Sequence, residues 1–256
     1  MTTRERQQYS SHDNKIQPTK LQGEEKTDYA GIDELWANEK FLSNYNVDIV
    51  NKLSKFSDKN SEVLEFGAGL GTLSRIWHSI KFNKPECLEI DSSLQGILLD
   101  RDFICYKNLK EINKTFDIVY TSNVLEHIED DVSVLKQLNT IIKVNGFLAI
   151  YVPAFMCLYN QIDSSVGHYR RYEKVELIKK LLEANFTIKE CYYVDSIGFF
   201  AWLSVKLKGY GDNNKLGSGN SLKIYDKFIY PLSALLDRLG LKYLFGKNLL
   251  VIAQKH

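Results

Sequence analysis

A glycine-rich turn between a predicted strand and a predicted helix is the part of this sequence best suited to bind a nucleoside. The run 63–66 is apolar apart from one acid, and a helical pattern extends over 70–80. Glycines at every second position let the backbone adopt positive φ and approach a ligand closely. Free N–H groups and the positive end of the helix dipole lie beside such a turn. The segment with this turn contains Glu65, Gly67, Ala68, Gly69 and Gly71.

An acid further along the chain completes a nucleoside site. The predicted strand 86–90 leads to Asp91, 22 residues after Gly69, and Ser92 follows it. An acid at about this spacing accepts hydrogen bonds from ribose hydroxyls in doubly wound sheets. The glycines are spaced G-x-G-x-G rather than the G-x-G-x-x-G of dinucleotide enzymes, which disfavours an NAD-type oxidoreductase.

Two histidines could accept a proton near the bound nucleoside. The predicted strand 116–121 leads into a polar loop with Asn123, Val124 and His127, and His168 lies in a separate loop. Imidazole changes charge near neutral pH and therefore serves as a general base. For His127 the alternative is a structural hydrogen bond that fixes its loop. Either histidine is a candidate base.

The residues that follow His168 form a candidate acceptor site, namely Tyr169, Arg170, Arg171 and Tyr172. Guanidinium groups match phosphate or carboxylate, and tyrosine rings offer flat surfaces for stacking. Adjacent arginines usually comprise one buried partner and one solvated charge, so only one of them is expected to meet the substrate.

Composition excludes several classes of protein. The chain has 256 residues, 44% apolar and 25% charged, as in ordinary globular domains. Its net charge of +1 gives no global field that would attract nucleic acid. The cysteines form no C-x-x-C pair, so we expect a reducing cytoplasm and no metal. The longest largely apolar run, 197–205, is too short to span a bilayer.

Strands and helices alternate along most of the chain and position these residues. The polar stretch 1–30 has almost no large aliphatic side chains, so we expect a mobile tail. Two short helices are predicted within 31–57, before the strand–helix units of 62–195. A helical insertion, 196–247, separates these units from a last strand at 248–254. Such alternation predicts an α/β doubly wound sheet.

The C-terminal helical insertion carries the clearest charge asymmetry. From residue 203 to the C-terminus, nine Lys or Arg stand against three Asp. Helices are predicted at 197–208 and 221–239, and Pro231 should kink or split the second. Basic residues beside aromatic side chains could form a face for a membrane surface or anionic lipid. The alternative is a helical subdomain with an ordinary solvated basic face.

Taken together, these motifs resemble those of the class I methyltransferases that use S-adenosylmethionine. The resemblance rests on E-x-G-x-G-x-G, on the acid that ends 88–91 and on the segment 123–127, and it extends from about Trp36 to the C-terminus. It implies a Rossmann-like, seven-stranded sheet with one antiparallel strand and an N-terminal helical lid. It also implies that the glycine turn surrounds the methionine part of the cofactor, that Asp91 holds the ribose, and that the 123–125 segment lies beside the sulfonium.

One family feature is missing from the sequence. Members often have an acid after the third strand that accepts from the adenine amino group, and the segment 106–109 has none. Asn108 could accept there through its amide oxygen.

Several segments resemble one bacterial branch of this family, whose members often accompany glycosyltransferases that handle polyprenyl-phosphate sugars. They are 158–163, 167–172, Tyr225-Asp226 and Phe245-Gly246. The branch implies O-methylation of a saccharide, glycolipid or related small molecule, with S-adenosylhomocysteine as the second product. N-methylation of a small molecule is an alternative, as is a cofactor-binding but inactive subunit of a glycosyltransferase system. The implied partners are a glycosyltransferase or a membrane surface, and the implied location is the cytoplasm or the inner face of the membrane.

Overall fold

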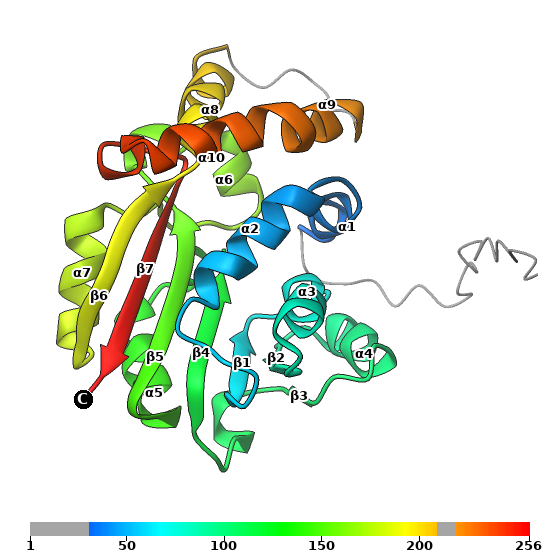
Figure 1. Cartoon of the computed structure of the whole chain (residues 1–256), viewed down its shortest axis with the longest axis vertical. Helices are drawn as coiled ribbons and strands as arrows, with labels where there is room; N and C mark the ends of the chain where they lie inside the picture. Colours follow the sequence, from blue (N-terminus) through cyan, green and yellow to red (C-terminus); the bar gives the residue numbers. More distant parts are fainter. Residues whose placement is uncertain (1–30, 209–218) are drawn as a thin grey trace, which may run out of the picture.

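A seven-stranded sheet flanked by helices forms the centre of the protein (Figure 1). The computed structural model describes residues 31–208 and 219–256, so the predicted tail 1–30 lies outside the described residues. The strand order is β3-β2-β1-β4-β5-β7-β6. Only β7 runs antiparallel to its neighbours among the described strands, which confirms the predicted fold class. The strands are β1 (Val63–Phe66), β2 (Glu86–Leu88), β3 (Cys105–Tyr106), β4 (Phe116–Ser122), β5 (Ile142–Pro153), β6 (Phe186–Val194) and β7 (Asn248–Lys255).

Helices precede, connect and follow the parallel strands. The N-terminal pair is α1 (Ile32–Phe41) and α2 (Ser43–Leu53), and the connecting helices are α3 (Thr72–Lys81), α4 (Ser92–Asp100), α5 (Asp131–Ile141), α6 (Gln161–Ser165) and α7 (Lys174–Glu183). The insertion before β7 contains α8 (Ser196–Lys208), α9 (Gly219–Ile224), the π-helical turn η4 (Tyr225–Ile229) and α10 (Tyr230–Arg238). Short 3₁₀ turns are η1 (Leu109–Glu111), η2 (Leu125–His127), η3 (Met156–Leu158) and η5 (Leu241–Tyr243). The carboxyl ends of the parallel strands point towards α8 and α10 (Figure 1).

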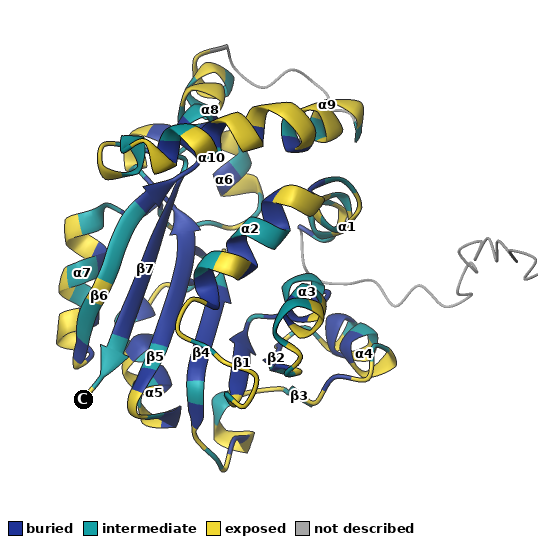
Figure 2. Cartoon of the chain, in the orientation of Figure 1, coloured by how far each residue is buried: buried dark blue, intermediate teal, exposed yellow. Residues whose placement is uncertain are grey.

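The central strands of the sheet are buried (Figure 2), and an apolar cluster covers each face of the sheet. On one face α5 and α7 contribute Leu135 and Leu177 to the core. On the other face α2 and α3 contribute Ile49 and Trp77, and Trp77 stacks on Tyr120 of β4 with ring centroids 4.6 Å apart. Burial of each such side chain contributes about 1.5–3 kcal/mol, so both helical layers are held mainly by the hydrophobic effect.

The junction between α5 and β5 differs from the prediction. The sequence predicts a helix over 131–143, a turn at Asn145-Gly146 and a strand over 146–152. In the structure the helix ends at Ile141, β5 begins at once, and the register between β4 and β5 shifts nearby. A Cβ at Gly146 would lie 2.9 Å from the carbonyl oxygen of Asp117. Asn145 has a φ of 65°, and the pairing with β4 passes from Phe116–Ile142 to Ile118–Phe147, so the predicted turn at Asn145-Gly146 is present as an irregularity within β5.

Pro231 alters its helix without ending it. The predicted helix 221–239 corresponds to a continuous helical stretch from α9 through α10, with η4 just before the proline. Proline has no N–H to continue the helical pattern, and a π-helical turn is a common way to accommodate such a break.

Asp226 ties the N-terminal helices to the insertion. Its carboxylate accepts hydrogen bonds from the backbone N–H groups of Asn44 (3.1 Å) and Tyr45 (2.9 Å) in the first turn of α2. The first N–H groups of a helix have no partner within the helix and favour a negative charge. Asp226 is buried, so this contact fixes the two helical parts on each other above the sheet. None of the described helices has the length and apolarity needed to cross a bilayer.

Candidate active site

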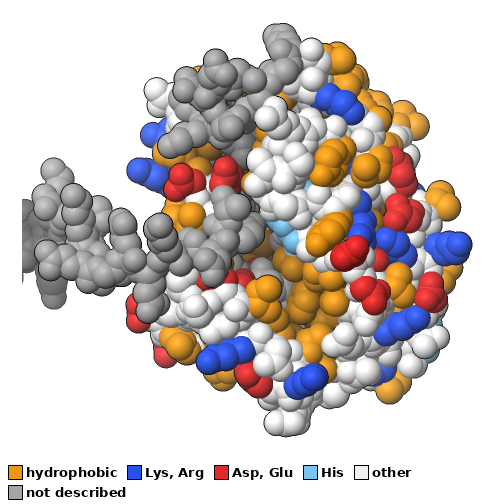
Figure 3. Space-filling model, turned by 180° about the vertical axis from the view of Figure 1, so that it is seen from behind, with side chains coloured by type: hydrophobic (Ala, Val, Ile, Leu, Met, Phe, Trp, Pro, Cys, Tyr) orange, Lys and Arg blue, Asp and Glu red, His pale blue; other side chains and the backbone are white. Residues whose placement is uncertain are grey.

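A cavity of about 1110 Å³ lies at the carboxyl ends of the parallel strands. Figure 3 shows a hollow lined by hydrophobic side chains, with a histidine at its edge. The lining begins at the glycine turn after β1, passes both candidate histidines and ends at α8 and α9. Pockets for single small ligands measure about 300–1,000 Å³, so this cavity has room for a cofactor and an acceptor together.

The backbone of the glycine turn forms one wall of the cavity. Gly67 has a φ of 75°, and a Cβ there would lie 2.4 Å from Cγ2 of Val124. Gly71 has a φ of 73°, and a Cβ there would lie 2.6 Å from Cδ2 of Leu98. Both positions therefore need glycine for conformation and for space. Gly67, Ala68 and Gly69 line the cavity, whereas Gly71 does not line it and packs against Leu98 of α4.

Glu89, which the sequence analysis did not single out, faces the glycine turn more directly than Asp91. It follows β2, is buried, and accepts a hydrogen bond from the N–H of Gly69 at 2.8 Å. Asp91 is the N-cap of α4 and accepts from the N–H groups of Ser93 (3.0 Å) and Leu94 (3.1 Å). Both acids line the cavity. The spacing of 20 residues between Gly69 and Glu89 is the signal that could have identified it.

Glu65 lies at the base of the turn and bonds to α3 and β4. Its Oε2 accepts hydrogen bonds from the hydroxyls of Ser74 (2.5 Å) and Tyr120 (2.9 Å). Burial raises the pKa of Glu65 to about 7, because desolvation disfavours the charged form more than these hydroxyls stabilise it. The side chain lines the cavity and at the same time fixes the helix that begins after the turn.

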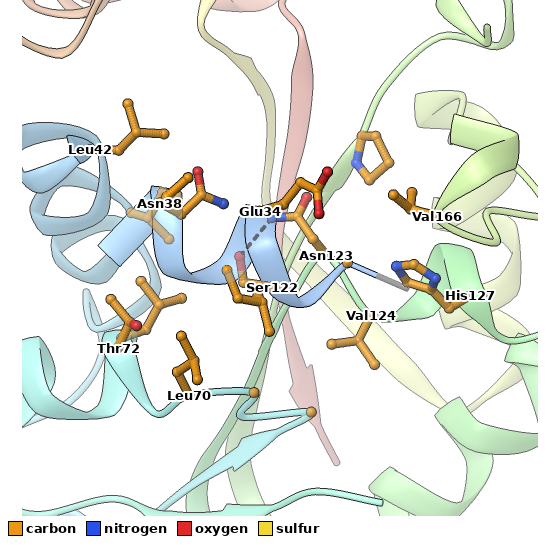
Figure 4. Close-up of a pocket in the computed structure, with 18 of the residues that line it drawn as sticks. Glu34, Asn38, Leu42, Leu70, Thr72, Ser122, Asn123, Val124, His127 and Val166 are labelled. Atoms are coloured by element: carbon orange, nitrogen blue, oxygen red, sulfur yellow. Dashed lines mark hydrogen bonds between the residues drawn. The ribbon is translucent and has the colours of Figure 1, made fainter. Parts of the chain in front are cut away.

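The loop after β4 brings two further predicted residues to the cavity. Asn123 has a φ of 53° and donates from its side-chain amide to the hydroxyl of Ser122 at 3.2 Å (Figure 4). Val124 packs against Gly67, and both Asn123 and Val124 line the cavity.

Of the other predicted cofactor positions, Ser92 lines the cavity and Asn108 does not. The amide oxygen of Asn108 accepts from the N–H of Lys110 at 3.0 Å and its nitrogen donates to Glu111 at 3.0 Å, so this side chain caps η1. The expectation that Asn108 contacts adenine is corrected accordingly.

Helix α1 forms the opposite wall of the cavity. Figure 4 shows Glu34 and Asn38 on this helix, with Asn123 and Val124 across from them. Oε2 of Glu34 is buried and has no hydrogen-bond partner among the described residues. A buried carboxylate oxygen in this state requires a donor or a cation. Glu34 is a second residue that sequence reasoning missed, because an acid in a predicted helix is indistinguishable from a solvated one.

The structure brings His127 and His168 together beyond the β4 loop. Their ring centroids lie 4.5 Å apart, their planes make an angle of 84°, and both rings line the cavity. Burial lowers the pKa of His127 to about 4, and the nearby His168 acts in the same direction. Nδ1 of His168 lies 2.9 Å from Oδ1 of Asp163, a buried carboxylate.

Glu126, directly before His127, lies under the two rings. The side chain is fully buried, and Oε1 lies 3.9 Å from Nε2 of His168. Neither carboxylate oxygen has a hydrogen-bond partner on another of the described residues. Burial raises the pKa of Glu126 to about 8, because desolvation outweighs the hydrogen bond from its own backbone N–H and the attraction of Arg171.

The two neighbouring arginines have different surroundings. Arg171 is 2% exposed, and its Nη2 lies 2.8 Å from Oδ1 of Asp163. Its side chain lines the cavity but is already paired. Arg170 pairs with Asp131 (2.9 Å) and donates to the carbonyl oxygen of Glu129 (2.9 Å), away from the cavity lining.

Tyr169 and Tyr172 also lie outside the cavity lining. Tyr169 is 54% exposed, whereas Tyr172 is fully buried and donates from its hydroxyl to Asp131 at 2.7 Å. The backbone of this segment bonds to the end of β5, so successive side chains point in different directions. Of the four residues predicted to bind the acceptor, only Arg171 lines the cavity, and its guanidinium is already paired with Asp163.

Lys247 is a cation in the cavity lining that no sequence pattern singles out. Its Nζ lies 5.2 Å from the ring centroid of Tyr45, 5.8 Å from that of Trp202 and 5.6 Å from that of Tyr225. Burial alone would lower the pKa of Lys247, but Tyr45 and Asp195 outweigh it and raise the pKa. The ammonium group therefore stays charged between aromatic rings.

Comparison with known proteins identifies the class to which this fold and site belong. A model of the methyltransferase domain matches residues 38–190, so the chain belongs to that family. The protein is accordingly an S-adenosylmethionine-dependent methyltransferase, which confirms the prediction made from the motifs. The particular bacterial branch named above stays a prediction.

Solved structures share the fold at low sequence identity. A S-adenosylmethionine-dependent methyltransferase from Archaeoglobus fulgidus is similar with a TM-score of 0.56 at 16% identity, over 87% of this chain and 99% of that one. Phosphoethanolamine N-methyltransferase 2 of Haemonchus contortus, in complex with S-adenosyl-L-methionine, gives 0.59 at 15% identity, over 88% of this chain and 57% of that one. A search of curated protein sequences gives no significant match.

The residues around the glycine turn fit the cofactor of this class. Its methionine part carries an ammonium group, which suits the buried carboxylate oxygen of Glu34 that has no partner in the described part of the chain. Its ribose hydroxyls suit the carboxylate of Glu89. Because Gly67 has no side chain, the backbone itself forms the cavity wall that faces the ligand.

Proposed function

We propose that the protein transfers the methyl group of S-adenosylmethionine to a hydroxyl group of a saccharide, a glycolipid or a related small molecule. One observation carries this proposal: a single cavity joins the glycine turn to His127 and His168 and continues to α8 and α9. The cofactor end and the acceptor end are thus parts of the same cavity, as direct transfer of a methyl group requires.

At the cofactor end we assign the ribose to Glu89 and the ammonium group to Glu34, with Asp91 and Ser92 beside them. Bound S-adenosylmethionine supplies an electrophilic methyl carbon, whose bond to sulfur breaks with its electron pair going to sulfur as the acceptor oxygen bonds to carbon. The protein contributes position and exclusion of water, since an in-line approach of about 3 Å is needed. We assign the activation of the acceptor hydroxyl to the pair His127 and His168.

Beyond the histidines, Lys247 and the rings around it support an acceptor that combines a sugar with an acidic group. Aromatic faces stack on sugar rings, and an ammonium group attracts phosphate or carboxylate. Nζ of Lys247 already forms an ion pair with the buried carboxylate of Asp195 at 3.6 Å, so the aromatic rings give the stronger support for a sugar. Apolar side chains of Ala201, Val205 and Leu222 line the cavity next to this group.

An exposed apolar stripe on the insertion supports a peripheral position at a membrane, which suits a glycolipid acceptor. The stripe lies along the continuous helix from α9 to α10, which carries many exposed residues (Figure 2), and its members are 52–74% exposed. It comprises Ile224, Phe228, Leu232, Leu235 and Leu239. Basic side chains flank it, namely Lys223, Lys227, Arg238 and Lys242. Apolar side chains between cations are typical of helices that lie in an anionic membrane surface.

The reaction is tested with isotope-labelled S-adenosylmethionine and panels of saccharides, glycolipids and small amines. We expect label in a saccharide or glycolipid fraction, with the product carrying an O-methyl group by mass spectrometry and NMR. Label in an amine alone would replace this acceptor class with N-methylation. Absence of S-adenosylhomocysteine binding in calorimetry would contradict the cofactor assignment itself.

The membrane contact is tested by co-sedimentation with phosphatidylglycerol vesicles. The double variant Leu232→Glu, Leu235→Glu should pellet much less than the wild type, because two charges then enter the stripe. The variant Leu182→Glu is the control, since Leu182 is 56% exposed on α7, away from the insertion. Equal pelleting of all three proteins would contradict a membrane role for the stripe.

A further inference from the structure

Three side chains that can ligate a metal converge at the histidine end of the cavity. One ligand atom each from Glu126, His127 and His168 lies within 4.8 Å of the others. The two segments involved are held together by a hydrogen bond from the N–H of Tyr169 to the carbonyl oxygen of Glu126 at 2.8 Å. The cluster is therefore fixed by the backbone, although its members are distant in the sequence.

The carboxylate of Glu126 is the independent sign of a ligand. It is 0% exposed, and both its oxygens lack a hydrogen-bond partner on another of the described residues. Arg171, the nearby guanidinium, is bonded to Asp163 through Nε and Nη2. Burial of a carboxylate without a bonded partner is costly. A cation placed between Glu126 and the two rings would remove that cost.

Both imidazole rings are oriented in the way that metal-bound histidines are. Nδ1 of His168 lies 2.9 Å from Oδ1 of Asp163, which Arg171 in turn fixes. The ring of His127 hydrogen-bonds to the backbone at Val166 and Gly167. In metal sites the second ring nitrogen of a ligating histidine bonds to a carboxylate or a backbone carbonyl, and this sets the ring's direction.

We propose that Glu126, His127 and His168 bind a divalent transition-metal cation of the Zn²⁺ or Mn²⁺ type, and that this cation holds the acceptor hydroxyl. The inference rests on the proposed function and adds how the hydroxyl is activated. Two imidazoles with one carboxylate form a known set for such cations and leave coordination positions open to a substrate. A hydroxyl bound to the cation loses its proton to solvent more readily. Its oxygen then forms the bond to the methyl carbon while the carbon–sulfur bond breaks towards sulfur.

Metal binding itself is the test, measured on the full chain with Zn²⁺ by calorimetry and with Mn²⁺ by electron paramagnetic resonance. We expect one site per chain in the wild type. Glu126→Gln and His168→Ala should weaken binding about 10-fold or more. His78→Ala is the matched control, because His78 is exposed on α3, outside the cluster, and its loss should change nothing.

A second measurement separates this inference from the proposed function. Calorimetric binding of S-adenosylhomocysteine should be the same for the wild type and for Glu126→Gln, which also reports that the variant is folded. Removal of metal with EDTA should slow methyl transfer and leave that binding intact. Equal metal binding by wild type and Glu126→Gln, or full methyl transfer without metal, would overturn the metal site and leave the methyltransferase. Loss of methyl transfer with every acceptor and every metal would instead refute the proposed function.

Discussion

The two ends of the cavity are built in different ways. The cofactor end is a single strand–turn–helix unit in which backbone conformation and glycine spacing define the wall, as the close packing of Gly67 on Val124 shows. The histidine end is assembled from side chains of η2, α6 and the segment after α6, and it is fixed by buried ion pairs such as Asp163 with Arg171. One end is therefore encoded locally, whereas the other depends on contacts that only the complete fold creates.

This difference has an energetic counterpart. A backbone wall needs no charge pairing, and the main buried acid near it, Glu65, is satisfied by two hydroxyls. At the histidine end, carboxylates and a guanidinium are taken out of water together, which is stabilising only while every partner is present. We therefore expect changes at the histidine end to affect the whole protein, and changes at the glycine turn to affect mainly the ligand.

The largest effect is expected from Asp163→Asn. The change leaves the guanidinium of Arg171 buried beside a neutral amide, which should lower the free energy of unfolding by about 3–5 kcal/mol. Urea denaturation followed by circular dichroism measures this. The control Asp102→Asn removes an exposed pair with Lys84 and should have a much smaller effect. If Asp163→Asn lowers the free energy of unfolding no more than the control does, the histidine end is not held together by buried ion pairs, and it does not differ from the glycine turn in this respect.

Gly67→Ala should weaken cofactor binding strongly, with less effect on folding. The new Cβ would lie 2.4 Å from Cγ2 of Val124 at a φ of 75°, so the turn or the β4 loop must shift. We expect the affinity for S-adenosylhomocysteine to fall by about 3 kcal/mol. Gly240→Ala is matched in its positive φ, has open space around it, and should leave calorimetric binding unchanged. Wild-type affinity in Gly67→Ala would place the ligand elsewhere.

Glu65→Gln should change how stability depends on pH. The pKa of Glu65 in the folded chain is about 7, above its ordinary value, so the folded state binds more protons than the unfolded state between about pH 4.5 and 7. The protonated carboxyl therefore stabilises the folded state at low pH. This contribution to the free energy of unfolding, on the order of 2–3 kcal/mol, is lost as the pH rises to 7. Thermal unfolding at several pH values should show the wild type losing stability relative to the variant across this range. Parallel curves would refute the raised pKa.

Glu89→Gln gives the smallest expected effect and separates the two acids near the ribose. Loss of a charge-assisted hydrogen bond should weaken S-adenosylhomocysteine binding by about 1–3 kcal/mol. Asp91→Asn, which mainly alters the cap of α4, should weaken it less. The reverse order in calorimetry would return the ribose to Asp91.

The contrast between the two ends also explains what the sequence could predict. The alternation of strands and helices, the glycine turn and the β4 loop follow from local patterns of apolar residues and glycine, and these predictions hold in the described residues. The seven-stranded sheet with one antiparallel strand was implied by the family resemblance, and the order of its strands comes from the structure alone. The sequence pattern points to Asp91 and does not single out Glu89, although both are acids near the end of β2, and only the structure shows which one bonds to the turn.

The acceptor end was predicted less well for a physical reason. Tyr169 to Tyr172 look like one recognition group in sequence, but an extended segment bonded to β5 sends neighbouring side chains to the surface and to the core in turn. Glu126 and Lys247 gained their significance only from partners far along the chain, such as His168 and Tyr45. Side-chain clusters of this kind leave no local pattern to recognise.

The most direct measurement of the central claim is a crystal structure of the chain with S-adenosylhomocysteine. We predict the ribose hydroxyls within hydrogen-bond distance of Glu89 and the homocysteine sulfur on the side of His127 and His168. A ligand bound outside this cavity, or a sulfur turned away from the two histidines, would contradict the account.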